Sequence, residues 1–222
     1  MKRAIVTGAA GLIGRGICRA LIDDGWTVAA LDLKPGPDQT RSVICDVGDE
    51  ASVQAAFAEL GWDGLDLLVN NAGVFPEEGS ETLEELPLEC FEEAFAVNVV
   101  GVARVTRAFL RLLTRSPHPR VVNISSRAGS ISQKEDSRHY CYSASKAALN
   151  MLTRTMAAEL RPRGITVVAV TPGWVKTEMG GPKAPLSVEE SARSLAAMID
   201  RVTPGDAGQF LDRDGKRDTT AW

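Results

Sequence analysis

The feature that most constrains the fold is a buried strand that leads through a glycine-rich turn into an amphipathic helix. Arg3–Thr7 predicts the strand, Gly8–Gly14 contains three glycines, and Ile17–Ile22 continues with helical spacing. Glycines let a backbone turn tightly and approach a phosphate, which then sits among the free N–H groups at the helix N-terminus. A glycine pattern alone is weak evidence, but strand, turn and helix together predict a nucleotide phosphate site in an α/β fold.

A carboxylate in the next strand supports this interpretation. Thr27–Leu31 predicts a second strand, and Asp32 follows it, eighteen residues beyond Gly14. A carboxylate at this place suits the adenosine ribose hydroxyls and would repel a 2′-phosphate. The alternative is that Asp32 is a solvated residue of the turn that continues into Lys34–Pro37.

The rest of the chain alternates between predicted strands and helices, which favours a parallel sheet covered on both faces. In such sheets, ligands bind beyond the carboxyl ends of the strands, so Gly8, Asp32, Asn70 and Ser126 are expected on one rim. The further strands are expected at Ser42–Cys45, Leu65–Val69, Arg120–Ser126, Ile165–Val170 and Gln209–Leu211, and helices at Glu50–Leu60, Phe91–Arg115, Tyr142–Leu160 and Val188–Val202.

Composition excludes several classes of protein. The 222 residues fit one α/β domain, and the net charge of −4 gives no basic surface for nucleic acid or anionic membrane. We see no signal peptide and no apolar stretch of transmembrane length, so a cytoplasmic protein is expected. The four cysteines are scattered and lack zinc-ligand spacing, so we predict buried, reduced thiols and no metal site. The acidic stretch Glu77–Glu85 is expected to be a solvated loop and helix start.

Two residues do not fit the apolar stripe of the helix expected at Phe91–Arg115. Asn98 and Gly101 interrupt the spacing of its large apolar side chains. A small local irregularity explains them, and so does a bend that frees a backbone carbonyl for water or a ligand.

Tyr142 and Lys146 form the candidate catalytic pair. They are four residues apart, so on a helix they lie on one face. A free tyrosine titrates near pH 10, and a neighbouring ammonium is expected to lower its pKa and make it a usable general acid/base. Such a pair is common by chance. The case for a catalytic role is strengthened by the predicted nucleotide-binding turn at the start of the same chain.

Together these motifs resemble the short-chain dehydrogenase/reductase family across essentially the whole chain. The resemblance implies a single Rossmann-type, doubly wound parallel sheet of about seven strands over residues 1–222, with helices on both faces. The matching motifs are Thr7–Gly14, Asp32, Asp46-Val47, Asn70-Asn71-Ala72-Gly73, Asn98, Ile124-Ser125-Ser126, Tyr142 with Lys146, and Pro172-Gly173.

The resemblance also implies roles for individual residues. Tyr142 would be the general acid/base, Lys146 would hold the nicotinamide ribose, and Ser126 would hydrogen-bond the substrate oxygen. Ser126 is preferred to Ser125 because Ser-x-x-Gly is the family's usual continuation. Asn98 would hold a water in the proton relay. The cofactor contacts would come from Gly8, Gly11, Leu12, Ile13, Gly14, Asp32, Asp46, Val47, Asn70, Ala72, Gly73, Tyr142, Lys146, Pro172, Gly173 and Thr177.

Three departures from the family pattern refine the expectation. The glycine spacing is that of longer, epimerase-type members, but 222 residues leave no room for their additional substrate domain. Ser126 and Tyr142 are sixteen residues apart, which suggests a small insertion between them. The segment after Pro172-Gly173 is short and rich in glycine and proline, so we expect a loop-like flap. The C-terminal part resembles a compact, carbonyl-reductase-like and C-factor-like subgroup.

The leading functional expectation is an NAD-dependent oxidoreductase that interconverts a small alcohol and a ketone or aldehyde. Asp32 favours NAD, and NADP is the less favoured cofactor. The alternative is a dinucleotide-binding signalling or regulatory protein with little turnover, and an epimerase or dehydratase is weaker still. Two apolar-rich helices, Phe91–Arg115 and Tyr142–Leu160, suggest a homodimer or homotetramer.

Overall fold

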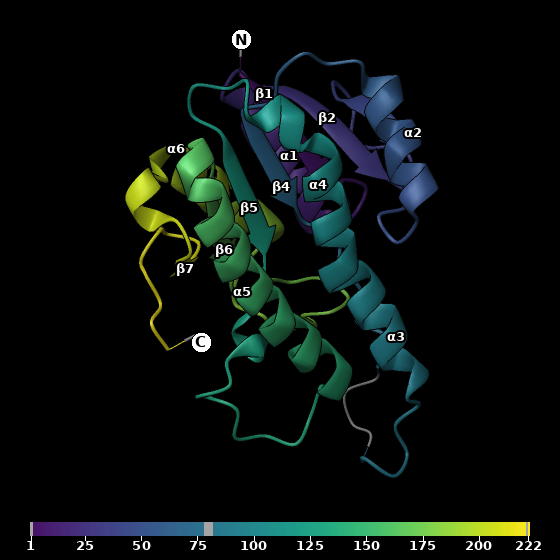
Figure 1. Cartoon of the computed structure of the whole chain (residues 1–222). Helices are drawn as coiled ribbons and strands as arrows, with labels where there is room; N and C mark the ends of the chain where they lie inside the picture. Colours follow the sequence, from purple (N-terminus) through teal and green to yellow (C-terminus); the bar gives the residue numbers. More distant parts are fainter. Residues whose placement is uncertain (1, 78–81, 221) are drawn as a thin grey trace.

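The computed structural model describes residues 2–77, 82–220 and 222, and its strands form one parallel sheet (Figure 1). Seven strands follow one another in the order β3-β2-β1-β4-β5-β6-β7. This confirms the doubly wound α/β fold expected from the alternation of strands and helices. The strands are β1 (Arg3–Thr7), β2 (Thr27–Asp32), β3 (Arg41–Ile44), β4 (Leu67–Asn70), β5 (Arg120–Ile124), β6 (Thr166–Val170) and β7 (Phe210–Leu211).

Helices cover both faces of the sheet, because buried strands alternate their side chains between two apolar cores. In β1, Ile5 packs into one core while Ala4 and Val6 pack into the other. The first core is closed by α2 (Glu50–Leu60), α4 (Val102–Leu113) and α5 (Tyr140–Leu160), and the second by α1 (Leu12–Asp23) and α6 (Val188–Arg201). Among the described residues, no helix is sufficiently long and apolar to span a bilayer.

The strand order reverses next to β1, and this places the glycine turn at the carboxyl end of an inner strand of the sheet. β1 pairs with β2 on one side and with β4 on the other, although β3 separates β2 from β4 along the chain. The helices that follow β1 and β4 therefore leave the sheet on opposite faces. The crevice that results beyond the carboxyl ends of these strands is where open α/β sheets bind ligands.

The helix expected at Phe91–Arg115 is irregular where Asn98 and Gly101 interrupt its pattern. Helix α3 (Glu89–Phe95) passes into a π-helical turn, η1 (Ala96–Gly101), before α4 begins. Gly101 lies against Val47, and a Cβ on it would come within 3.1 Å of the valine side chain. The irregularity brings Asn98, which is fully buried, to the edge of the site.

Two expectations for this region were wrong. Cys90 of α3 and Cys141 of α5 form a disulfide, and only Cys18 and Cys45 are free, buried thiols. Glu77 is not solvated but 6% exposed, because its carboxylate accepts hydrogen bonds from the first turn of α5. The rest of the acidic stretch falls partly on residues 78–81, outside the described part of the chain, and α3 begins at Glu89 rather than within that stretch.

Candidate active site

The glycine turn is a close-packed cradle at the carboxyl end of β1. A Cβ on Gly14 would lie 2.2 Å from the carbonyl oxygen of Gly8, so only glycine allows α1 to start this near the turn. The side-chain amide of Asn71 donates to the carbonyls of Thr7 (2.9 Å) and Gly8 (3.0 Å). The Thr7 hydroxyl accepts from the N–H groups of Asn71 and Ala72, both at 3.0 Å. The turn is thus fixed from β4 as well as from β1.

Asp32, the last residue of β2, lies next to the glycine turn. Its carboxylate accepts from the N–H of Ala10 (2.9 Å) in the glycine turn and from the N–H of Lys34 (3.2 Å). Asp46 and Val47 lie beyond β3, where the Asp46 carboxylate accepts from the N–H of Gly48 at 2.7 Å. These residues line up along the same rim as the glycine turn, as the order of the strands requires.

The residues after β4 divide between the core and the rim. Asn70 is 2% exposed, and its amide nitrogen donates to Thr106 (3.1 Å) and Asn123 (2.9 Å) in the core. Its side chain therefore points away from the rim, and any contact to a cofactor would come from its backbone. Gly73 faces two of the candidate catalytic residues, since a Cβ on it would lie 3.2 Å from Asn98 Oδ1 and 3.6 Å from Lys146 Nζ.

A cleft of about 300 Å³ opens beside these residues. Its lining includes Ile13, Asn71, Gly73, Phe75, Ser126, His139, Tyr142, Lys146, Pro172, Gly173, Trp174, Thr177 and Met179. A second cavity of about 500 Å³ shares Ser126, Gly173 and Trp174 with it, and its lining adds the charged residues Arg127, Asp212, Arg213 and Asp214. Ser126 stands between the two cavities.

Tyr142, Ser126 and Lys146 converge on the first cleft. Lys146 is 5% exposed; its ammonium donates to the carbonyl of Ile124 at 2.9 Å and lies 5.5 Å from the centroid of the Tyr142 ring. Burial lowers the pKa of Lys146 from 10.5 to about 8, because the charged form loses its hydration. Ser125, in contrast, donates to Asn150 at 2.6 Å inside the core. Both serines line the cleft, but the Ser125 hydroxyl is used by Asn150, whereas the Ser126 hydroxyl hydrogen-bonds Tyr142.

The pKa of Tyr142 departs from the expectation drawn from its spacing to Lys146. Burial raises it to about 12, and a hydrogen bond with Ser126 offsets only part of this increase. The expectation that the Lys146 ammonium lowers the pKa of Tyr142 was wrong, because desolvation destabilises the phenolate more than its neighbours stabilise it. Tyr142 is therefore a neutral phenol near neutral pH, the form that donates a proton.

Helix α5 is positioned for this arrangement by a close approach at Gly129. A Cβ on Gly129 would lie 2.6 Å from the backbone carbon of Lys146 and 2.7 Å from the nitrogen of Ala147. Only a glycine lets the short 3₁₀ turn after Ser126, Arg127–Gly129, touch the backbone of α5. The distance between Ser126 and Tyr142 depends on this contact.

Asn98 is a structural link between the segment after β4 and α5. Its Oδ1 accepts from the N–H of Val74 (2.9 Å), and its Nδ2 donates to the carbonyl of Val74 and to Ser145 Oγ, both at 3.0 Å. The side-chain amide is thus engaged by protein groups. A water held at this position, as the proton relay would need, would therefore hydrogen-bond the backbone of the π-helical turn and not the Asn98 side chain.

The segment after β6 is a loop, as its glycines and prolines predicted. Thr177 Oγ1 accepts from the N–H of Gly180 (3.0 Å), and Trp174 Nε1 donates to the carbonyl of Gly180 (2.7 Å). Pro172 and Gly173 begin this flap, and Trp174 remains 56% exposed. The flap is therefore a tight turn beside the cleft, with no helical lid.

The sequence analysis gave no role to several residues of the site. Thr7 and Asn71 fix the glycine turn, while Phe75 places its ring 5.1 Å from that of Tyr142 and 5.0 Å from that of His139. His139, the residue directly before α5, has a positive φ of 63°. The Thr7–Asn71 contact could have been expected, because β1 and β4 are neighbours in such a sheet. No sequence signal pointed to Phe75 or His139.

Comparison with known proteins places this geometry in a family. The family described as short chain dehydrogenase matches residues 2–185. The chain belongs to the short-chain dehydrogenase/reductase family. It is 35% identical over 230 residues to L-xylulose reductase of Bos taurus, a match that covers 98% of this chain and 86% of the relative. It is 40% identical over 151 residues to C-signal of Myxococcus xanthus, covering 68% of this chain and 90% of the relative.

Solved structures of the family share the whole fold. The NADPH-bound carbonyl reductase from chicken fatty liver superposes with a TM-score of 0.89 at 31% identity, over 98% of each chain. A 3-ketoacyl-(acyl-carrier-protein) reductase from Brucella melitensis, complexed with NADH, gives a TM-score of 0.81 at 25% identity, over 95% of this chain and 96% of the other. Membership of this family supports alcohol–carbonyl oxidoreduction with a nicotinamide cofactor in general.

Proposed function

We propose that this protein is an NAD-dependent oxidoreductase that interconverts a small alcohol and its ketone or aldehyde, with Tyr142 as general acid/base. The observation that carries the proposal is the convergence of Tyr142, Ser126 and Lys146 on one cleft beside the glycine turn. Neither the glycine turn nor the tyrosine pair would be specific alone. The two lie together where the strand order of the sheet reverses, and this supports a single site that binds both a nucleotide and the reacting oxygen of a substrate.

The residues along the rim fit a dinucleotide. Gly8–Gly14 and the N-terminus of α1 would hold the pyrophosphate, because a side chain on Gly14 would fill the space at the turn. Asp32 would accept from the adenosine ribose hydroxyls, and Asp46 with Val47 would flank the adenine. Lys146 would donate to the nicotinamide ribose, with Thr177 near the pyrophosphate or the carboxamide. A bound nicotinamide supplies hydride exchange with the substrate carbon.

The chain's own side chains would handle the proton and the orientation of the substrate. Ser126 would donate a hydrogen bond to the substrate oxygen, and Tyr142 would transfer its proton to that oxygen during reduction. The raised pKa of Tyr142, about 12, keeps this proton in place near neutral pH. In the reverse direction the Tyr142 phenolate would accept the alcohol proton, so Tyr142 would first have to release its own proton to solvent. Lys146 and the backbone of the π-helical turn at Asn98 would connect the tyrosine to solvent through water.

Replacing the tyrosine tests this assignment. Tyr142→Phe is expected to lower kcat by roughly 100- to 10,000-fold while leaving NADH affinity nearly unchanged, because the ring still packs but the proton is gone. The chain has one other tyrosine, Tyr140, two residues away, so Tyr140→Phe is a matched control. Activity on a panel of small carbonyls is followed by NADH absorbance. Substantial activity in Tyr142→Phe would remove this residue from its role.

Cofactor choice follows from Asp32. A 2′-phosphate would meet a carboxylate already held by the N–H groups of Ala10 and Lys34, and like charges at close range can cost several kcal/mol. We therefore expect NADH to bind more tightly than NADPH. Fluorescence titration with both cofactors decides this, and equal or tighter binding of NADPH would contradict it.

A second function, signalling with little turnover, is supported by the similarity to C-signal of Myxococcus xanthus. The two hypotheses differ in what Tyr142→Phe does. A signalling role that needs only the folded, nucleotide-bound protein would survive this substitution, whereas one that depends on the reaction would be lost with kcat.

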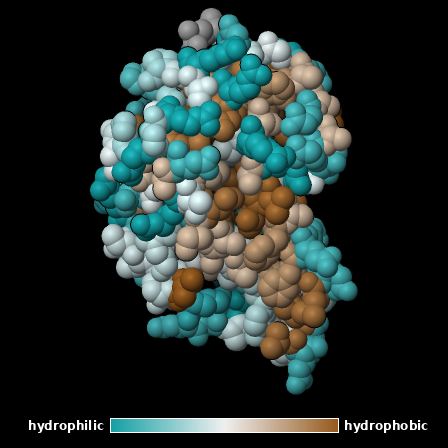
Figure 2. All heavy atoms as spheres, viewed as in Figure 1, coloured by the Kyte–Doolittle hydropathy of each residue, from teal (hydrophilic) through white to brown (hydrophobic). Residues whose placement is uncertain are grey.

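We also propose that the protein assembles as a homodimer or homotetramer. Apolar side chains gather on the surface over α3, α4 and α5 (Figure 2). Val100, in η1 between α3 and α4, is 47% exposed, and Met151 of α5 is 66% exposed. An isologous contact that pairs these helices would cover both residues. Light scattering at micromolar concentration tests it, and Met151→Glu is expected to shift the protein toward monomer.

A further inference from the structure

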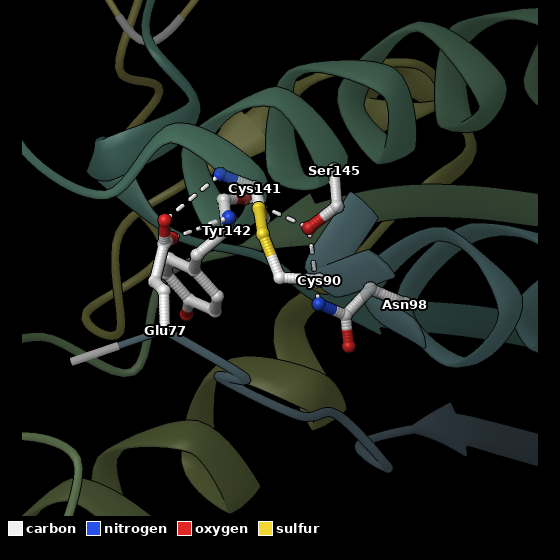
Figure 3. Close-up of a disulfide and its surroundings, with 6 residues drawn as sticks. All are labelled: Glu77, Cys90, Asn98, Cys141, Tyr142 and Ser145. Carbon is white, nitrogen blue, oxygen red and sulfur yellow. Dashed lines mark hydrogen bonds between the residues drawn. A yellow bond between two sulfur atoms is a disulfide. The ribbon is translucent and has the colours of Figure 1, made fainter. Parts of the chain in front are cut away.

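A disulfide links two helices next to the candidate catalytic tyrosine. Cys90 lies in the first turn of α3 and Cys141 in the first turn of α5, and their Cα atoms are 6.0 Å apart, within the range that a disulfide spans. Figure 3 shows the bond crossing from α3 to α5, with Tyr142 as the next residue along α5. The bond thus holds the stretch of backbone that carries Tyr142.

Two further side chains, Glu77 and Ser145, fix the same turn of α5. The Glu77 carboxylate accepts from the N–H of Cys141 (3.0 Å) and from the N–H of Tyr142 (2.8 Å). On the other side, Ser145 Oγ donates to the carbonyl of Tyr142 at 2.8 Å and accepts from Asn98 (Figure 3). The start of α5 around Tyr142 is therefore tied to Glu77, to Asn98 through Ser145, and to Cys90, and the disulfide is the covalent tie among the three.

The sulfur atoms have little room to separate. Cys141 is fully buried and Cys90 is 5% exposed, in an apolar cluster with Leu86 and Ala94. Two thiols must move apart to non-bonded contact, whereas a disulfide does not. In a close-packed cluster this separation has to be taken up by α3 or by the first turn of α5. The second alternative moves Tyr142 relative to Ser126.

We propose that Cys90 and Cys141 form a reversible redox modification site that sets the position of Tyr142, and that the disulfide form is the active one. The effect on turnover rests on the function proposed above, whereas the site itself does not. In the disulfide form, Tyr142 hydrogen-bonds Ser126 at the cleft. In the dithiol form, the first turn of α5 loses its covalent tie and turnover falls.

The chemistry needs a peroxide as oxidant and a dithiol as reductant. The Cys90 thiolate, the more exposed of the two, attacks a peroxide oxygen to give a sulfenic acid and hydroxide. The Cys141 thiolate then attacks this sulfur and displaces a second hydroxide, so two thiols and hydrogen peroxide give one disulfide and two waters. An added dithiol reverses the step by exchange, and is itself oxidised to a cyclic disulfide.

A metal ion is the competing use of the same sulfur atoms. The ligand atoms of Glu77, Cys90 and Cys141 lie within 4.8 Å of one another, as a Zn²⁺ site would need. The Glu77 oxygens, however, already accept from two N–H groups of α5. The disulfide is therefore the use that the contacts favour, and zinc binding is one of the outcomes that the experiment must separate.

The experiment equilibrates the full chain with hydrogen peroxide or with dithiothreitol. Alkylation and mass spectrometry measure the disulfide, and two readouts follow its effect: kcat, and hydrogen exchange of the amides of Cys141 and Tyr142. We expect reduction to lower kcat by roughly 10- to 100-fold, the scale of a displacement of about 1 Å, and to speed exchange of both amides. Cys90→Ala should stay at the reduced values in both buffers, and Cys18→Ala, which removes a free buried thiol, should follow the wild type.

Three results would overturn the proposal. The first is that Cys90 and Cys141 stay reduced in peroxide, and the second is that kcat and amide exchange are equal in the two forms. The third is that the reduced protein binds one Zn²⁺ which protects both thiols from alkylation, with loss of that binding in Cys90→Ala. If no carbonyl is turned over in either form, the proposed function fails, but mass spectrometry and amide exchange still decide whether the redox site exists and moves Tyr142.

Discussion

Replacing Lys146 by methionine should stabilise the protein at neutral pH while it removes activity. Burial lowers the pKa of Lys146 from 10.5 to about 8, so the folded state at pH 7 holds a charge that the unfolded state accommodates more easily. The gap between these values corresponds to about 3 kcal/mol, because one pKa unit is worth about 1.4 kcal/mol. Methionine fills a similar volume without the charge, but it loses the hydrogen bond to the Ile124 carbonyl, worth about 1 kcal/mol. Lys146→Met should therefore be more stable by about 2 kcal/mol at pH 7.

The sign of the pH dependence makes the reasoning specific. Between pH 8 and pH 10.5 the unfolded chain binds the proton of Lys146 while the folded chain has released it, so wild-type stability rises with pH in this window. The advantage of Lys146→Met should therefore shrink by about 2 kcal/mol between pH 7 and pH 10. The exposed Lys183 provides the control, since Lys183→Met should show no such change.

The assay is urea unfolding of both variants and the wild type without cofactor, at pH 7 and pH 10, with kcat measured in parallel. A difference in unfolding free energy between Lys146→Met and the wild type that does not vary with pH would refute the argument. So would a variant that is less stable than the wild type at pH 7. Either result would mean that the ammonium is solvated or paired in the folded state, and that its burial carries no cost.

Three other predictions concern close contacts and the disulfide. Gly129→Ala should cost about 1–3 kcal/mol in urea unfolding and lower kcat, because its Cβ would overlap the backbone of α5. Gly14→Ala should weaken NADH binding in a titration, because its Cβ would lie 2.2 Å from the Gly8 carbonyl oxygen. Reducing the Cys90–Cys141 bond, which closes a sequence separation of 51, should lower the free energy of unfolding by about 4 kcal/mol. Cys90→Ala should not respond to dithiothreitol, and a wild-type loss below about 1 kcal/mol would contradict the last prediction.

The parts of the site that the sequence predicted are those set by local pattern. Gly14 in the glycine pattern predicted the close approach of α1 to the turn. Asn98 and Gly101, which interrupt an apolar stripe, predicted an irregularity where the π-helical turn lies. What could not be predicted depends on distant segments that meet. Glu77 is acidic and lies in a polar stretch, and its burial becomes understandable only when the free N–H groups of α5 are seen beside it.

The two wrong expectations about chemistry have the same origin. A separation of four residues establishes that Tyr142 and Lys146 share a helix face, but it says nothing about how much water reaches either group. Burial of both side chains therefore raised the tyrosine pKa where proximity alone would lower it. For Cys90 and Cys141, 51 residues apart, the sequence contained no indication that α3 and α5 would bring them together.

The position of Ser126 between two cavities has a consequence for stereochemistry. One cavity includes Phe75 and Met179 in its lining, while the other carries charged side chains, Asp212 and Arg213 among them. A ketone whose oxygen lies at Ser126 would direct its two substituents into chambers of different chemistry. An unsymmetrical ketone with one apolar and one hydroxylated arm would then present a single prochiral face to the nicotinamide, and one enantiomer of the alcohol would predominate.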